Sequence, residues 1–522
     1  MQFNVRYQYI LATHCHISNQ MNTTKQLLPE TVAAIDLGSN SFHMIVARLE
    51  ESGTLSIIDR LQESVRLGGG LDKQGIIDES AQNRAFGCLE TFAQRIRGLP
   101  QSAVRVAGTN TLRVAKNARA FVSKAEKILN HPIEIIEGRE EARLIYLGVA
   151  HGLATKEGNR LVVDIGGGST ECIIGRGMQS LRRESFYTGC VSSNKRFFDD
   201  GTITKNSLKA AVLESALTVF PQSAGFQSGQ WDEAIGCSGT IKAIGNIVRE
   251  QGWCLNGISL DALHKLRGAL IDAGHIDNLK LAGLSENRKP VIAGGLSVLL
   301  AVFKILNIEL MQVSDQGMRE GLLYDLVGRI THQDVRDAAV EDAMSRWGVD
   351  TEQANRVTHT VEKLCQSACK QWSIDVEQIK PLVKWASMLH EVGLQVSHNN
   401  YHKHGAYILT NADMQGFSRQ EQALLAALVL SHRSKFRVYA FKQLMKPFVK
   451  AGKHMCVLLR IAILLHRGRT DQPIPDINIT VRNKKINLSF PKGWLDDHSM
   501  TLADLIKEIN YLDAAGYKLS FE

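Results

Sequence analysis

The chain has 522 residues and a net charge of +8; 44% of its residues are hydrophobic and 22% are charged. This composition excludes a disordered or fibrous protein and favours a globular chain of about three or four domains. The longest uncharged apolar stretch, residues 291–303, is too short to span a bilayer, and the nine cysteines contain no CxxC pair, which favours reduced thiols in the cytoplasm over a disulfide framework.

The first 30 residues lack a clear hydrophobic period, a long apolar core and a small-residue cleavage site. They therefore do not have the pattern of a signal peptide. We expect residues 1–30 to be disordered, or to be partly mis-annotated sequence that precedes a true start at Met21.

A first α/β unit is expected over residues 31–147. Short β-like runs alternate there with amphipathic helical patterns, at residues 32–37, 41–48, 55–60, 79–97, 104–107, 118–129 and 133–136. The first strand runs directly into residues 36–41 (DLGSNS), where an acid at the strand end is followed at once by glycine and hydroxyl residues.

The same order restarts near Leu161 and defines a second unit over residues 148–328. A strand there leads into residues 164–170 (DIGGGST), and a later strand-to-glycine transition at residues 234–240 opens a helix at residue 241. The two similar beginnings predict a duplicated α/β unit.

Each acid–glycine loop is expected to be a tight turn whose backbone N–H groups face an anion. The acid of such a turn can hold a divalent cation beside that anion. Two loops from two half-domains can close on a phosphate chain from opposite sides, whereas either loop alone also fits an ordinary turn between strands.

Residues 329–470 are expected to form a helical domain and residues 471–522 a small α+β domain. Helical patterns without strand signals follow one another through the former, at residues 338–347, 353–372 and 379–389, and on to about residue 467. The tail has two alternating runs typical of a hairpin, then a helical pattern and a last strand, at residues 477–481, 485–490, 502–510 and 517–521.

Residues 422–470 contain no Asp or Glu. They hold ten basic residues: Arg433, Lys435, Arg437, Lys442, Lys446, Lys450, Lys453, Arg460, Arg467 and Arg469. Such a stretch attracts a polyanion, such as a phosphate polymer or an anionic membrane, and the alternative is a solvated helix face. Nucleic acid is not expected as a partner, because no base-reading motif accompanies the charge and aromatic residues make up only 6% of the chain.

The two loops and residues 236–240 resemble the phosphate-binding and nucleotide-binding loops of the actin, heat-shock ATPase and sugar-kinase superfamily. Several longer strings narrow the resemblance to the exopolyphosphatase and guanosine pentaphosphate phosphohydrolase family: residues 34–42, 138–144, 164–171, 236–240 and 318–321. Residues 386–394 (ASMLHEVGL) are similar to the long bacterial exopolyphosphatase form. The resemblance implies a pair of ribonuclease-H-like α/β domains, an all-α HD-like domain and a small α+β domain.

The resemblance also implies Mg²⁺-dependent hydrolysis of a terminal phosphoanhydride. Glu141 matches the family's general base, although Glu140 and Glu141 alone also fit acids that complement a helix N-terminus. Of the two, Glu140 is expected to be structural. Metal ligands are expected at Asp36 and Asp164, with Glu171 as a further metal contact.

Phosphate-binding residues are expected in the two loops and at two basic positions: Gly38, Ser39, Asn40, Arg113, Gly166, Gly167, Gly168, Ser169 and Lys242. Arg113 matches a family arginine that contacts the terminal phosphate, and a surface arginine is the alternative. Arg66 is a weaker candidate for a phosphate contact.

The helical domain resembles the HD phosphohydrolase fold, whose metal site uses an adjacent His-Asp pair. The pair here is His390-Glu391, with candidate companions at His359, His402, His404 and His432. Because glutamate displaces its oxygen by about 1 Å relative to aspartate, we expect a structural hydrogen-bond cluster rather than a second metal centre.

Processive exopolyphosphatase is the main function that we predict, because the basic C-terminal half can bind the rest of a polymer. The alternatives are a guanosine pentaphosphate 5′-phosphohydrolase, which converts pppGpp to ppGpp, a non-hydrolytic polyphosphate or alarmone sensor, and a phosphotransferase of the sugar-kinase type. The presence of Glu141 disfavours the sensor. We expect a cytoplasmic homodimer that can contact the inner face of the cell membrane peripherally.

Overall fold

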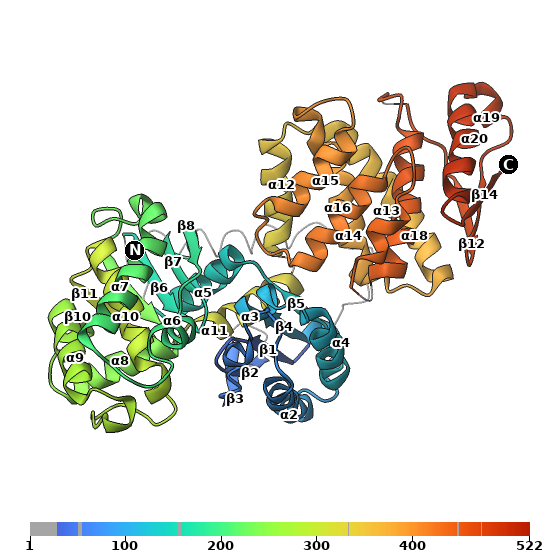
Figure 1. The fold of residues 1–522 in the computed structure, drawn as a ribbon. Helices are drawn as coiled ribbons and strands as arrows, with labels where there is room; N and C mark the ends of the chain where they lie inside the picture. Colours follow the sequence, from blue (N-terminus) through green and yellow to red (C-terminus); the bar gives the residue numbers. More distant parts are fainter. Residues whose placement is uncertain (1–28, 51–54, 154–157, 332, 446–447, 471) are drawn as a thin grey trace.

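The computed structural model describes residues 29–50, 55–153, 158–331, 333–445, 448–470 and 472–522. Two α/β lobes, a helical domain and a small C-terminal module follow one another along the chain (Figure 1). The segment expected to be disordered, residues 1–30, lies almost wholly outside the described residues.

The first lobe is built on a five-stranded sheet in the order β3-β2-β1-β4-β5. Its strands are β1 Thr31–Leu37, β2 Phe42–Leu49, β3 Leu55–Glu63, β4 Val104–Gly108 and β5 Ile133–Ile135. The first three strands are antiparallel neighbours, and β1, β4 and β5 run parallel. Both faces of β1 are buried: Ala33 and Ile35 belong to one hydrophobic core, and Val32 and Ala34 belong to another.

Helices cover both faces of this sheet. The helices of the lobe are α2 Glu79–Arg95, α3 Asn110–Val114, α4 Ala118–Leu129 and α5 Gly138–Gly152. On one face α2 and α4 complete the first core, and on the other α5 packs with α11, Met318–Ile330, which returns from the end of the second lobe. The core around α5 and α11 also contains Val162 and Ile173 of the second sheet, so this helix pair lies between the two sheets.

The second lobe repeats the strand arrangement of the first. Its strands are β6 Arg160–Ile165, β7 Thr170–Arg176, β8 Gln179–Phe186, β9 Glu233–Cys237, β10 Ile258–Ser259 and β11 Leu310–Val313. The sheet order is β10-β11-β9-β6-β7-β8. Strand β6 pairs antiparallel with β7 and parallel with β9, as β1 pairs with β2 and β4. The predicted duplication of an α/β unit is confirmed.

Five helices accompany the second sheet in the described residues: α6 Cys190–Phe197, α7 Lys205–Val219, α8 Ser238–Glu250, α9 Leu260–Ala273 and α10 Ile292–Leu306. The segment Lys289–Leu306 is long and apolar enough for a membrane span by composition, but 72% of it is buried inside the lobe. We therefore assign α10 to the core. Helix α8 begins at Ser238, three residues before the expected start at residue 241.

The helical domain contains α12 Val335–Arg346, α13 Thr351–Trp372, α14 Val376–Leu389, α15 Tyr401–Asn411, α16 Arg419–Ser431, α17 Val438–Lys442 and α18 Phe448–Leu465. The C-terminal module contains β12 Asn478–Arg482, β13 Lys485–Ser489, α19 Trp494–Asp497, α20 Ser499–Asp513 and β14 Lys518–Phe521. Its sheet has the order β12-β13-β14, and its helix α20 is longer than the expected 502–510. Apolar residues of this module, such as Ile486 and Leu512, share one hydrophobic core with the helical domain.

Candidate active site

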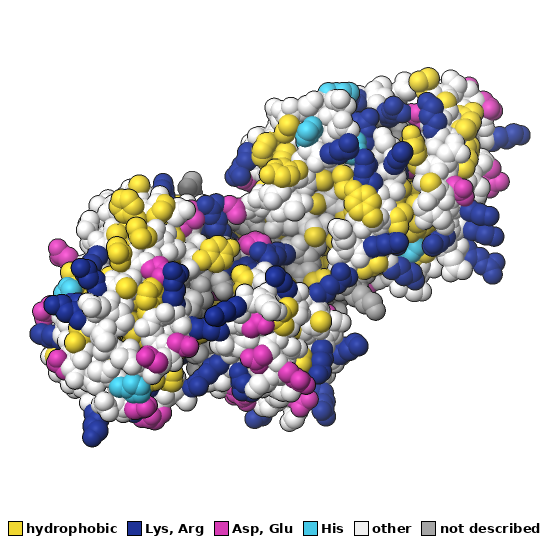
Figure 2. All heavy atoms as spheres, viewed as in Figure 1, with side chains coloured by type: hydrophobic (Ala, Val, Ile, Leu, Met, Phe, Trp, Pro, Cys, Tyr) yellow, Lys and Arg dark blue, Asp and Glu magenta, His cyan; other side chains and the backbone are white. Residues whose placement is uncertain are grey.

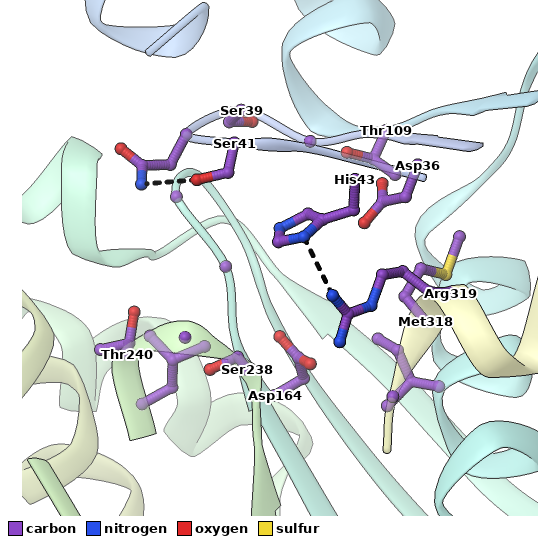
Figure 3. A pocket seen from close by; sticks show the side chains of 18 of the residues that line it. Asp36, Ser39, Ser41, His43, Thr109, Asp164, Ser238, Thr240, Met318 and Arg319 are labelled. Atoms are coloured by element: carbon purple, nitrogen blue, oxygen red, sulfur yellow. Dashed lines mark hydrogen bonds between the residues drawn. The ribbon is translucent and has the colours of Figure 1, made fainter. Parts of the chain in front are cut away.

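A cavity of about 180 Å³ opens where the loops after β1 and β6 face each other. Asp36 and Asp164 project into it from the two lobes, and Arg319 at the start of α11 lies beside them (Figure 3). The cavity is also lined by most of the predicted loop residues: Gly38, Ser39, Asn40, Gly166, Gly167 and Ser169. The structure thus brings together residues that lie some 130 positions apart in the chain.

The two acid–glycine loops touch each other across the cavity. A Cβ atom on Gly167 would lie 3.0 Å from Cβ of Ser39 and 3.4 Å from the backbone nitrogen of Asn40. Within the first loop, a Cβ on Gly38 would lie 2.8 Å from the carbonyl oxygen of Ser41. The close approach of the backbone therefore requires glycine at these two positions.

Buried carboxylates concentrate negative charge at this cavity. Burial, followed by the charges of Glu141 and Asp164, raises the pKa of Asp36 to about 8, and its Oδ1 has no hydrogen-bond partner among the described residues. Burial also raises the pKa of Asp164 to about 6, although Cys237 Sγ donates a hydrogen bond of 3.2 Å to Asp164 Oδ2. The repulsion between these neighbouring carboxylates is relieved when a cation binds between them or when one of them is protonated.

Glu141 lies in the first turn of α5 and lines the cavity. Its Oε2 accepts a hydrogen bond of 2.7 Å from Nη1 of Arg113, which also donates to the carbonyl oxygen of Ile136 at 2.9 Å. The Arg113 side chain is only 2% exposed and does not line the cavity. The Arg113 guanidinium holds the Glu141 carboxylate, and its Nη2 has no hydrogen-bond partner among the described residues. A contact of Arg113 with the terminal phosphate stays a prediction.

Glu140, the neighbouring acid, points away from the cavity. It accepts two hydrogen bonds of 2.8 Å from Arg143 and one of 2.9 Å from the backbone N–H of Gly416 in the helical domain. The prediction that Glu140 is the structural member of the pair is confirmed.

Basic and imidazole groups also line the cavity. Lys242, which was predicted, lines it together with three residues to which sequence analysis gave no role: His43, Arg288 and Arg319. Burial, and then the charge of Arg319, lowers the pKa of His43 to about 3, so this imidazole is neutral and its Nδ1 lies 3.3 Å from Nη1 of Arg319 (Figure 3). Arg319 belongs to the string at residues 318–321 on which the family resemblance partly rests, and that membership could have indicated its place in the cavity.

Three further predicted residues do not line the cavity. Glu171 lies directly opposite Asp164 in the β6–β7 ladder, is buried, and accepts a hydrogen bond of 2.8 Å from Ser185. Burial, and then the charges of Glu141 and Asp164, raises the pKa of Glu171 well above its usual value, so Glu171 belongs to the same group of carboxylates. Gly168 faces a neighbouring cavity of about 350 Å³ that is also lined by Lys195. Arg66 is exposed and lines neither cavity.

Three histidines of the helical domain form a buried group. His390, His402 and His432 are buried near one another, and the ring centroids of His390 and His432 lie 5.6 Å apart. Among the described residues, no group of three His, Cys, Asp or Glu side chains is arranged to hold a metal ion. Glu391 is instead paired with Arg469. His390 Nε2 and both ring nitrogens of His402 have no hydrogen-bond partner among the described residues, so the hydrogen-bond cluster expected there does not join these side chains.

Ion pairs with the C-terminal module neutralise part of the charge of the basic stretch, residues 422–470. Arg460 is buried in an ion pair of 2.8 Å with Glu508, and Arg467 pairs with Asp504 at 2.6 Å. Exposed lysines remain on the same domain, at Lys435, Lys442 and Lys450, and Figure 2 shows basic side chains scattered over the face of the helical domain and tail rather than gathered in one groove.

Comparison with known proteins identifies the relatives of this chain. The profile of the Ppx/GppA phosphatase family matches residues 45–330, and that of Ppx/GppA phosphatase domain III matches residues 335–509. A guanosine-5′-triphosphate,3′-diphosphate pyrophosphatase of Pseudoalteromonas atlantica is 37% identical over 94% of this chain and 97% of its own length, and one of Aeromonas hydrophila is 35% identical over 93% and 97%.

The crystal structure of an exopolyphosphatase from Cytophaga hutchinsonii is similar to 57% of this chain over 98% of its own length, with 25% identity and a TM-score of 0.52. The similarity supports the actin-like architecture of the two lobes. The chain therefore belongs to the Ppx/GppA phosphatase family.

Proposed function

We propose that the protein is a guanosine pentaphosphate 5′-phosphohydrolase, which removes the terminal 5′-phosphate of pppGpp and leaves ppGpp. The observation that carries the proposal is the similarity, over almost the whole chain, to curated relatives named for guanosine-5′-triphosphate,3′-diphosphate. The sequence prediction ranked exopolyphosphatase first and this activity as its alternative, and these relatives favour the alternative.

The cavity supplies the groups that phosphoanhydride hydrolysis requires. Glu141, oriented by Arg113, takes a proton from the attacking water while the water oxygen bonds to the terminal phosphorus. The bond from that phosphorus to the bridging oxygen then breaks, and the electron pair stays on the 5′-diphosphate. Backbone N–H groups of the two loops and the basic side chains that line the cavity, Arg319 among them, stabilise the charge on the phosphate oxygens.

Mg²⁺ is part of this proposal. The unpartnered Oδ1 of Asp36 and the raised pKa values of Asp36 and Asp164 fit a site that a divalent cation would complete. Two carboxylates suffice, because Mg²⁺ is commonly held by one or two carboxylates together with substrate phosphates and water. When bound, the ion neutralises charge on the transferred phosphoryl group. Glu171, which lies opposite Asp164 in the β6–β7 ladder, is the proposed further metal contact.

The test is phosphate release by the purified protein with Mg²⁺, given pppGpp and long-chain polyphosphate in parallel. We expect release chiefly from pppGpp, and a fall of roughly 10²–10⁴-fold in the Glu141→Gln variant. Glu90→Gln is the matched control, because Glu90 is an exposed residue of α2 that lies outside the cavity. Equal loss in both variants, or no release from pppGpp by the wild type, would contradict the proposal.

Exopolyphosphatase is the second candidate. It is favoured by the exposed lysines of the helical domain, Lys435, Lys442 and Lys450, and by the similarity to the C. hutchinsonii exopolyphosphatase. Release chiefly from polyphosphate, reduced when these three lysines are replaced by glutamine, would establish it instead.

We also propose an HD-like relationship for the helical domain and a cytoplasmic homodimer that can contact an anionic membrane peripherally. Analytical ultracentrifugation of the full chain tests the dimer. Co-sedimentation with anionic vesicles tests the membrane contact.

A further inference from the structure

The start of α5 is held from outside the two lobes. Strand β5 is the edge of the first sheet, and Glu137 is the N-cap of α5, so only two residues separate the strand from the helix that carries Glu141. The backbone N–H of Glu141 donates to the carbonyl oxygen of Glu137 at 2.9 Å. Any displacement of residues 136–137 therefore displaces Glu141.

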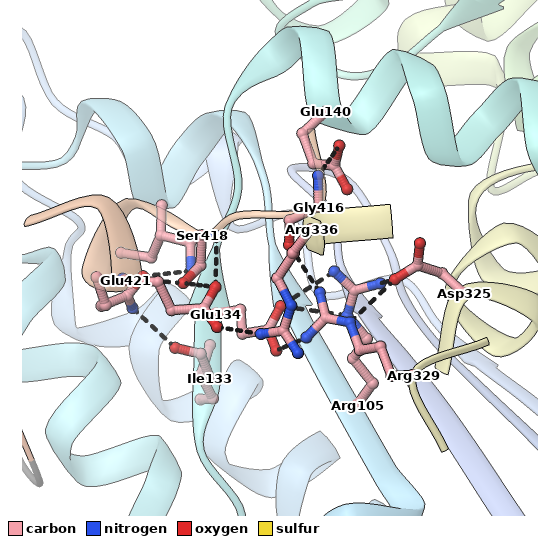
Figure 4. Close-up of polar contacts among 12 residues, drawn as sticks. Arg105, Ile133, Glu134, Glu140, Asp325, Arg329, Arg336, Gly416, Ser418 and Glu421 are labelled. Atoms are coloured by element: carbon pink, nitrogen blue, oxygen red, sulfur yellow. Dashed lines mark hydrogen bonds and ion pairs between the residues drawn. The ribbon is translucent and has the colours of Figure 1, made fainter. Parts of the chain in front are cut away.

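A short piece of the helical domain, residues 416–421, lies against this connection; we call it the docking segment. Figure 4 shows Gly416, Ser418 and Glu421 of this segment beside Glu140 and Ile133 of the first lobe. Ser418 and Glu421 form a capping box at the start of α16, in which the Ser418 backbone N–H donates to Glu421 at 2.8 Å. The capping box fixes the backbone of the docking segment.

Gln420 completes the free edge of β5. Its side-chain Nε2 donates to the carbonyl oxygen of Ile133 at 2.9 Å, and its Oε1 accepts from the N–H of Ile135 at 3.1 Å. One amide side chain thus satisfies the same two groups that a neighbouring strand would satisfy. The strand that leads to Glu137 is therefore hydrogen-bonded on both of its edges.

Arg419 contacts two residues that position Glu141: Glu137 and Arg113. Its guanidinium makes a two-pronged ion pair with the Glu137 carboxylate, and its Nη1 donates to the carbonyl oxygen of Arg113 at 3.1 Å. Arg113 in turn holds Glu141. Arg419 is therefore linked to the base by two short routes, one through the helix N-cap and one through the arginine that orients its carboxylate.

We propose that the docking segment of the helical domain, through Arg419 and Gln420, positions Glu141 for hydrolysis. The helical domain is then part of the catalytic apparatus, not only a substrate-binding or dimerisation module. Arg419 is a positioning residue, because it touches neither the cavity nor the reacting atoms. Its side chain is 41% exposed and that of Glu137 is 40% exposed, so their ion pair adds little to global stability.

Only the kinetic part of the test rests on the proposed function. In Arg419→Gln we expect kcat to fall roughly tenfold with KM within about twofold of wild type, because a small misplacement of a base costs the chemical step. Arg419→Lys keeps the positive charge opposite Glu137 but loses the planar guanidinium that makes two contacts with the carboxylate, so it should give an intermediate kcat. Arg346→Gln is the matched control, since Arg346 forms an exposed ion pair with Asp342 within α12, away from the cavity and from α5.

Hydrogen–deuterium exchange of the same proteins without substrate supplies a readout that does not depend on activity. We expect faster exchange of residues 136–141 in Arg419→Gln and wild-type exchange in Arg346→Gln, with both proteins folded. Unchanged kcat and unchanged exchange would overturn the proposal, as would a fall in kcat that only follows a fall in melting temperature. If the wild type hydrolyses neither pppGpp nor polyphosphate, the proposed function fails, and exchange alone decides the role of the docking segment.

Discussion

Helices α5 and α11 meet through their backbones, and this contact provides the sharpest structural prediction. A Cβ on Gly321 would lie 1.8 Å from the carbonyl oxygen of Leu144, and a Cβ on Gly148 would lie 2.0 Å from the carbonyl oxygen of Gly317. No side chain intervenes between the helices at this point. Because α5 carries Glu141 and α11 carries Arg319, the spacing of the helices sets the spacing of two cavity groups.

The perturbation is Gly321→Ala. To take the new Cβ from 1.8 Å to an ordinary contact of 3.4 Å, the helices must separate by about 1.6 Å. Overpacking of this kind costs about 3 kcal/mol at the upper end, because the obstacle is a backbone carbonyl that cannot rotate away. Alanine recovers about 1 kcal/mol through its better helix propensity. We therefore expect a net loss of about 2 kcal/mol and, since Glu141 shifts, a fall in kcat of up to about 10²-fold.

The assay is thermal unfolding together with phosphate release, with Gly87→Ala as the control. Gly87 lies in α2, and a Cβ there would meet nothing within 4 Å, so the control should be more stable by about 0.5–1 kcal/mol. Gly321→Ala should melt roughly 5 °C lower than wild type. If it were as stable and as active as Gly87→Ala, the inferred backbone contact between α5 and α11 would be wrong.

Three further predictions concern buried charge, pH and metal. Arg460→Met should destabilise the protein by about 3–5 kcal/mol in urea unfolding, because Glu508 is left buried without its partner, and Arg460→Met combined with Glu508→Leu should recover most of the loss. Burial lowers the pKa of His454 from 6.5 to about 4, so the unfolded chain binds the proton more readily than the folded protein, and the free energy of unfolding should fall as the pH drops from about 6.5 to 4. In His454→Gln this fall should be smaller by up to about 3 kcal/mol, and a pH profile parallel to that of the wild type would contradict the prediction. Asp36→Asn should raise the Mg²⁺ concentration for half-maximal phosphate release by roughly tenfold or more, and an unchanged Mg²⁺ requirement would exclude Asp36 as a ligand.

Local chemistry made the two lobes and most of their loops predictable from the sequence. An acid at the end of an apolar run, followed at once by glycines, specifies a strand and a tight turn within a few residues, and both copies of that pattern fold as expected. The position of Glu141 in the first turn of a helix was predictable for the same reason.

Features that depend on partners far along the chain were not predictable. The sequence around Arg113 contains nothing that distinguishes a phosphate contact from a contact with Glu141, 28 positions away. The acid-free stretch suggested a continuous basic field because Glu508, which pairs with Arg460, lies 48 positions away. His43 reads in sequence as an ordinary strand residue, and only the folded cavity places it beside Arg319.

Helices α5 and α11 lie between the two sheets and share one hydrophobic core with both of them. Their backbones touch at Gly148 and Gly321, so a shift of one helix displaces the other and changes the position of Glu141 or Arg319. The docking segment adds a second constraint on α5, because it holds the start of the helix while the glycine contact holds the helix further along, at Leu144 and Gly148. The catalytic base is therefore fixed from two independent directions, by the helical domain and by α11.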